Sequence, residues 1–146
     1  MILLDTNIVS EMMKPTPRPS VVTWLDAQDE ASLFICAPVL AELRYGAELL
    51  PAGKRRNELG KVIDQIESDL FRDRILPFEQ GAASHYARIA AARRHLGRPL
   101  NQMDGLIAAI ALSHGAVLCT RDEDGFADLG LEVVNPFIDL ATGRSS

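Results

Sequence analysis

The first seven residues, Met1-Ile2-Leu3-Leu4-Asp5-Thr6-Asn7, constrain the fold more than any other stretch of the chain. Three consecutive apolar residues run directly into an acid, a hydroxyl and an amide. An apolar run without alternation is typical of a strand that is buried on both faces, as in the centre of a parallel sheet. The carboxyl ends of such strands border the ligand crevice of open α/β sheets. Asp5 is therefore expected at that edge, where a buried acid requires a partner or a function.

Length and composition indicate one globular domain spanning residues 1–146. Of the 146 residues, 47% are hydrophobic and 24% are charged, which is ordinary for a globular protein with its own core. The net charge of −5 makes the chain a poor general binder of nucleic acid unless basic patches or bridging cations assist. No apolar segment is long enough to span a membrane and no secretory signal is evident, so we expect a cytoplasmic protein without membrane contact.

The two cysteines are expected to be inert. Cys36 and Cys119 each end an apolar run, and these two runs are predicted to flank the first strand on opposite sides. At the usual spacing of strands, the thiols would lie about 9–10 Å apart. That separation is too large for a disulfide, so two buried free thiols are predicted.

Apolar periodicity predicts strands that alternate with helices along the whole chain. Besides the first strand, the predicted strands are residues 32–36, 74–78, 116–119 and 131–134. The predicted helices are residues 8–13, 21–29 with Ser20 as N-cap, 38–50, 54–71, 79–96, and one that follows Asn101 as N-cap. Such alternation predicts a three-layer α/β/α fold around a central parallel sheet of four to five strands.

Four acids can reach the same edge of this sheet. Asp5 and Asp122 each follow an apolar strand, and Glu42 and Asp104 fall in early turns of helices. Each also has an ordinary explanation: a solvated helix edge for Glu42, a favourable helix N-terminus for Asp104, and a turn for Asp122. Gly105 favours a functional Asp104, because glycine in a first helical turn costs up to about 1 kcal/mol against alanine and indicates a close approach.

Four carboxylates in one pocket would repel each other, so they would share protons or hold a cation. An all-oxygen ligand set favours Mg²⁺ or Mn²⁺, and the natural reaction of such a site is phosphodiester hydrolysis. Other chemistries lack their residues. The three histidines have no HExxH spacing, and the chain contains neither a GxSxG elbow nor a phosphate-binding glycine loop.

At these residues the sequence resembles the PIN-domain ribonucleases, specifically the VapC-type toxins and most closely their FitB-like branch. The resemblance covers nearly the whole chain in the expected order. The matching segments are LLDTNIVSE (3–11), APVLAELRYG (37–46), MDGLIAAIA (103–111), TRDEDGF (120–126) and NPF (135–137).

This resemblance implies a metal-dependent endoribonuclease that is the toxin of a type II toxin–antitoxin pair. The implied catalytic residues and ligands of Mg²⁺ or Mn²⁺ are Asp5, Glu42, Asp104 and Asp122. The residues implied to orient these carboxylates or a water are Thr6, Asn7 and Thr120. Glu123 and Asp124 compete with Asp122 for the fourth position, and Asp122 is preferred because it is nearest the strand end.

The resemblance also implies partners. These are an RNA substrate, a second copy of the chain in a homodimer, and a cognate antitoxin whose C-terminal segment lies across the active site. Operator DNA would be bound only through the antitoxin. The basic stretches at residues 54–61 and 88–98 could contact RNA, antitoxin or only water, and a solvated face is favoured for the first.

Two other functions compete with the ribonuclease. A phosphatase of the haloacid-dehalogenase type requires a second aspartate two residues after the first, and position 7 is Asn. A non-catalytic binding module, active only in an antitoxin-bound repressor complex on operator DNA, would require no working metal site.

Overall fold

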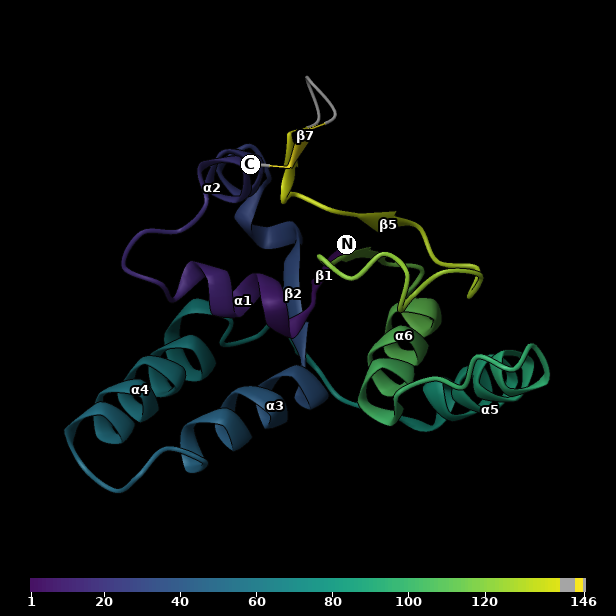
Figure 1. Ribbon diagram of the computed structural model, residues 1–146, viewed down its shortest axis with the longest axis horizontal. Helices are drawn as coiled ribbons and strands as arrows, with labels where there is room; N and C mark the ends of the chain where they lie inside the picture. Colours follow the sequence, from purple (N-terminus) through teal and green to yellow (C-terminus); the bar gives the residue numbers. More distant parts are fainter. Residues whose placement is uncertain (140–143, 146) are drawn as a thin grey trace.

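The computed structural model describes residues 1–139 and 144–145. Its strands are β1 (Ile2–Leu4), β2 (Leu33–Cys36), β3 (Ile75–Leu76), β4 (Val117–Cys119) and β5 (Val133–Val134). They form one parallel sheet in the order β3-β2-β1-β4-β5. The helices that flank it in this part of the chain are α1 (Thr6–Met12), α2 (Pro19–Asp26), α3 (Ala37–Glu48), α4 (Lys54–Gln65), α5 (Gln80–His95) and α6 (Gln102–His114) (Figure 1). The predicted α/β/α fold with a parallel sheet is confirmed.

Strand β1 is the centre of this sheet. Its Leu3 and Leu4 are fully buried, and it pairs in parallel with β2 on one side and β4 on the other. Cys36 and Cys119 lie on these two flanking strands as predicted, and both are buried free thiols. Burial raises the pKa of the Cys36 thiol to about 12 and also raises that of Cys119, so neither is a reactive thiolate.

Helix α1 begins directly after β1, two residues earlier than predicted. Asp5 directly follows the strand and is the N-cap of the helix, because its carboxylate accepts a hydrogen bond from the Thr6 amide. Helix α2 begins at Pro19 with Arg18 in the capping position, so the prediction of Ser20 as N-cap was wrong. Proline suits a first helical position because it lacks the amide hydrogen that would be unpaired there.

The predicted helix at 54–71 is two elements. Helix α4 ends at Gln65 and continues as a π-helical turn over Ile66–Leu70. Ile63 and Ile66 are buried, whereas Val62 and Leu70, which are apolar residues of the same segment, are 39% and 43% exposed. In α3 the buried residues are Pro38, Val39, Leu43 and Ala47, and Gly46 is exposed.

Two short strands follow the parallel sheet. Strand β6 (Ile138–Asp139) pairs antiparallel with β7 (Arg144–Ser145), and the sequence pattern predicted neither strand. Within the described residues, no helix combines the length and apolar character needed to cross a bilayer.

Candidate active site

A cavity of about 460 Å³ opens at the carboxyl edge of the sheet, and all four predicted acids line it. Asp5 follows β1, Asp122 follows β4, Glu42 lies in α3, and Asp104 lies in the first turn of α6. Parallel strands and the helices that follow them bring these residues together from positions up to 117 residues apart in sequence (5 to 122).

Hydrogen bonds fix the Asp5 carboxylate on both oxygens. One oxygen accepts from the Thr6 amide at 2.8 Å, and the other accepts from the Thr120 hydroxyl at 2.6 Å and from the Asn7 side-chain amide at 3.2 Å. Asp5 is only 5% exposed, and Thr120 is fully buried. The structure therefore places Thr6, Asn7 and Thr120 in contact with Asp5.

The same polar residues also hold two of the other acids. The Thr6 hydroxyl donates to Glu42 at 2.7 Å. The Thr120 hydroxyl oxygen accepts from the Asp122 amide at 3.1 Å while its own proton goes to Asp5. Thr120 therefore links the acid that follows β1 to the acid that follows β4.

Asp122 belongs to a turn that folds its carboxylate back on the chain. Its Oδ1 accepts from the Gly125 amide at 3.0 Å. Glu123 accepts instead from the side-chain amide of Asn135 at 3.2 Å. Asp122 is the member of the competing group that lines the cavity, and its catalytic role stays a prediction.

Asp104 lies at a capped helix start. The Asn101 side chain accepts from the amides of Met103 at 3.0 Å and Asp104 at 3.3 Å, as the predicted N-cap requires. The close approach expected at Gly105 is real, but its source is the Tyr86 ring of α5. A Cβ added at Gly105 would lie 2.8 Å from Cε2 of that ring. Gly105 is thus explained by helix packing, and it gives no support to a functional Asp104.

Two of the clustered acids resist ionisation. Burial raises the pKa of Asp5, partly offset by its hydrogen bonds from Thr120 and Thr6, and the charges of Glu42 and Asp122 raise it further. Burial also raises the pKa of Asp104 to about 6, with added repulsion from Asp5, Glu42 and Asp122. Mutual repulsion of this kind is relieved by a bound cation or a shared proton.

The donor chemistry of this cavity fits a hard divalent cation. Its candidate ligands are carboxylate oxygens, which suit Mg²⁺ and Mn²⁺. Among the residues described, no three acid, histidine or cysteine side chains already converge closely enough to hold an ion. Binding would therefore draw these carboxylates together from their present positions around the cavity.

A fifth acid and a cationic wall complete the cavity, and the sequence analysis missed both. Glu11 lines the cavity at 3% exposure, and its Oε2 lies 2.8 Å from the Lys14 ammonium. Hydrogen bonding to Lys14 lowers the pKa of Glu11, against the effect of its burial. Arg121 also lines the cavity, with its guanidinium 4.7 Å from the centre of the Phe137 ring. The three-residue spacing of Glu11 and Lys14 across the end of α1 was a signal that could have indicated their pairing.

The basic stretches have different surroundings. At 54–61, Lys54 and Arg56 pair with Glu58 and Glu48 on an exposed helix face, in agreement with a solvated face. At 88–98, Arg98 pairs with Asp128 at the surface, but Arg93 is buried at 5% exposure.

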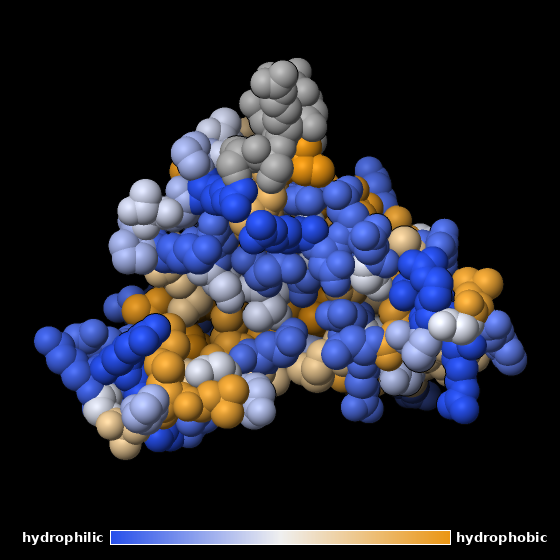
Figure 2. All heavy atoms as spheres, viewed as in Figure 1, coloured by the Kyte–Doolittle hydropathy of each residue, from blue (hydrophilic) through white to orange (hydrophobic). Residues whose placement is uncertain are grey.

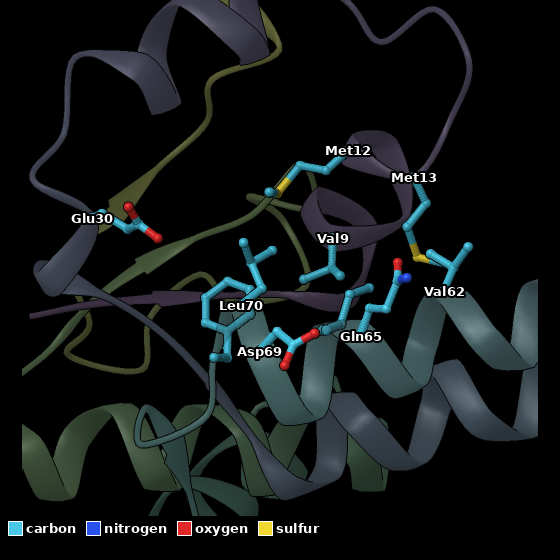
Figure 3. Close-up of a pocket in the computed structure, with 10 residues that line it drawn as sticks. Val9, Met12, Met13, Glu30, Val62, Gln65, Asp69 and Leu70 are labelled. Carbon is cyan, nitrogen blue, oxygen red and sulfur yellow. The ribbon is translucent and has the colours of Figure 1, made fainter.

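A second hollow, an apolar groove, lies between α1 and the α4 segment with its π-helical turn. Its walls include Val9, Met12 and Met13 on one side and Val62 and Leu70 on the other (Figure 3). Hydrophobic residues also gather on the surface over α3 and α4 (Figure 2). An exposed apolar concavity bounded by polar residues is typical of a site that binds another protein.

A parallel α/β sheet with acids gathered at its carboxyl edge is the arrangement of α/β proteins that bind a ligand at that edge. The chain belongs to the PIN domain family. Residues 2–131 match that family. The VapC ribonuclease Y4jK of Sinorhizobium fredii is 39% identical over 137 residues, which are 94% of this chain and 98% of that protein. Toxin FitB of Neisseria gonorrhoeae is 40% identical over 139 residues, covering 95% of this chain and 100% of FitB. A structure of FitAB bound to a DNA fragment superposes with a TM-score of 0.85 at 40% identity, over 93% of this chain and 95% of that one.

Proposed function

We propose that this protein is a Mg²⁺- or Mn²⁺-dependent endoribonuclease and the toxin of a type II toxin–antitoxin pair. The observation that carries the proposal is the cavity in which acids from four separate elements meet, two of them with raised pKa values. Similarity to a ribonuclease and to a toxin over almost the full chain supports it.

Each side chain has a distinct task in the proposed reaction. Asp5 and Asp104 would hold the ion, Asp122 would complete its ligand set, and Glu42 would bind the ion or position the attacking water. A bound divalent ion would supply Lewis acidity and lower the pKa of a water at the scissile phosphate. Thr6 orients Glu42, and Thr120 and Asn7 keep Asp5 in place through the hydrogen bonds described above.

An acidic protein requires local positive charge to bind RNA. Lys14 and Arg121 supply it on the wall of the same cavity. We propose that they contact phosphates beside the scissile bond, so that the substrate is held at the carboxylates despite a net charge of −5.

We further propose that the chain forms a homodimer and binds a cognate antitoxin, which in turn carries the pair to operator DNA. The groove between α1 and the π-helical turn suits an amphipathic segment of that antitoxin (Figure 3). The similar FitAB structure on DNA supports a partnered state of this kind. Because its substrate would be cellular RNA, we place the pair in the cytoplasm.

The test compares induction of the wild type with a D5A/D104A variant in a host without the antitoxin, followed by sequencing of RNA ends. Growth arrest and discrete new RNA ends are expected from the wild type only. A matched D73A variant changes an exposed acid that does not line the cavity and should behave as the wild type does. Purified protein should cleave RNA with Mg²⁺ or Mn²⁺ and lose the activity in a chelator.

Equal growth and identical RNA from folded wild type and D5A/D104A would overturn the ribonuclease proposal in favour of the non-catalytic repressor module. A D122N variant that stays fully active while D124N is inactive would instead move the fourth carboxylate from position 122 to 124.

A further inference from the structure

Arg93, in the last turn of α5, is buried, and its side chain donates hydrogen bonds to backbone carbonyls of a loop. Its Nε donates to the carbonyl of Arg98 at 2.9 Å, and its Nη1 donates to the carbonyls of Gly125 at 3.2 Å and Ala127 at 3.1 Å. A guanidinium at 5% exposure is costly unless its donors are paired. These bonds therefore tie the segment at 125–127 firmly to α5.

The same segment holds the carboxylate of Asp122. The Gly125 amide donates to Asp122 Oδ1 at 3.0 Å, while the Gly125 carbonyl accepts from Arg93. The fit is tight, because a Cβ added at Gly125 would lie 2.7 Å from Cγ of Asp122. Phe126, 2% exposed, anchors the turn in the core. The position of Gly125 thus sets where the Asp122 side chain can lie.

Helix α5 also contacts the element that carries Asp104. The Tyr86 ring, two turns before Arg93, packs against Gly105 of α6, the residue next to Asp104. The described residues that line the acidic cavity come from α1, α3, α6 and the loops around them, and α5 supplies none of them. From outside the cavity, α5 contacts the turn that holds Asp122 and the helix residue next to Asp104.

We infer that the contacts of α5 fix the separation of Asp122 and Asp104, and that Arg93 is the positioning residue for Asp122. The inference rests on the proposed metal site. A loosened Asp122 turn would let this carboxylate move away from the other acids of the cavity, and the affinity for the ion would fall. Loss of a residue that orients a metal ligand typically weakens metal binding about 10–100-fold.

The experiment measures Mn²⁺ affinity of the full chain by electron paramagnetic resonance for the wild type, R93M and R94M. Arg94 is the matched control, because it is the next residue of α5 and is exposed. R93M is expected to bind Mn²⁺ about 10–100-fold more weakly, and R94M to match the wild type. If R93M does not fold, two other variants test the same point. R93K keeps the buried charge without the planar guanidinium, and G125A displaces Asp122 directly. Both should weaken Mn²⁺ binding.

A double variant separates positioning from general destabilisation. If Arg93 acts through Asp122, R93M/D122A binds Mn²⁺ as weakly as D122A alone; a further loss of about tenfold would overturn the inference. Hydrogen exchange adds a metal-free readout, in which R93M should expose the Gly125 and Asp122 amides more than that of Asp104. A wild type that binds no Mn²⁺ would refute the proposed metal site and this inference together. A wild type that binds Mn²⁺ with R93M unchanged would refute only the role of Arg93.

Discussion

At the scale of single residues, Asp104 is an acid whose partly buried charge lowers the stability of the folded protein. Its pKa is raised from 3.8 to about 6, chiefly by burial and then by Asp5. The folded protein therefore binds more protons than the unfolded chain between about pH 4 and 6, and stability falls as pH rises through that window. The helix N-terminus offsets only about 0.3–1 kcal/mol of this cost. D104N should stabilise the metal-free protein at pH 8 by about 1–2 kcal/mol, measured by urea unfolding.

The pH dependence and a control decide whether this gain comes from the buried charge. At pH 4 the gain should vanish, because Asp104 is then protonated in the folded wild type. D124N makes the same chemical change at an exposed acid that does not line the cavity and should alter stability by less than about 0.5 kcal/mol. An unchanged or lower stability of D104N at pH 8 would show that Asp104 is not under electrostatic strain.

At the scale of elements, the packing of α5 on α6 opposes intrinsic helix propensity. Propensity alone predicts that G105A stabilises α6 by about 1 kcal/mol. The added Cβ would lie 2.8 Å from the Tyr86 ring, and overpacking typically costs about 1–3 kcal/mol. We therefore expect G105A to destabilise the protein by about 1–2 kcal/mol in thermal or urea unfolding.

Two comparisons test that cause. G46A changes an exposed glycine inside α3 whose added Cβ would meet no atom within 4 Å, so it should stabilise by up to about 1 kcal/mol. In a Y86A background the overpacking is removed, and G105A should become stabilising. A loss from G105A that persists without the Tyr86 ring would exclude helix packing as its source.

The sequence predicted the existence of helices and strands better than it predicted their ends and their packing. Apolar runs and periodicity depend on local sequence, so they predicted the parallel strands around β1 and the helix after Asn101. The starts of helices were predicted less accurately. Asp5 directly follows β1 and also caps α1, so this helix begins at Thr6, before the predicted start at residue 8. The burial of Arg93 and the contact at Gly105 arise from α5 packing against loops and helices distant in sequence, and no local pattern encodes them. The four acids could be placed at one edge because strand ends and the early turns of the helices share that edge. Glu11, which lies in the second turn of α1, was missed.

At the scale of the whole molecule, the proposed metal site predicts that a divalent cation stabilises the fold, because the protein combines a net charge of −5 with an acidic cavity. A ligand that binds only the folded state stabilises it by about 2.7 kcal/mol at 100 times its Kd. For a chain of this length that corresponds to a rise in Tm of about 5–10 °C. Mn²⁺ added to chelator-treated protein at pH 8 should produce this rise in a calorimetric scan.

If Mn²⁺ binds at the acidic cavity, the rise in Tm should depend on the ion, on the cavity acids and on pH. Sodium chloride at equal ionic strength screens surface charges but provides no ligand-bound ion, so it should shift Tm far less than Mn²⁺ does. D5A/D104A should lose the Mn²⁺ response, because it removes the two acids whose ionisation is most opposed in the metal-free protein. For the wild type, the response should diminish as pH falls below about 6, where Asp104 takes up a proton that competes with the ion. A full Mn²⁺ response in D5A/D104A would place the stabilising ion elsewhere in the protein and separate metal binding from the proposed active site.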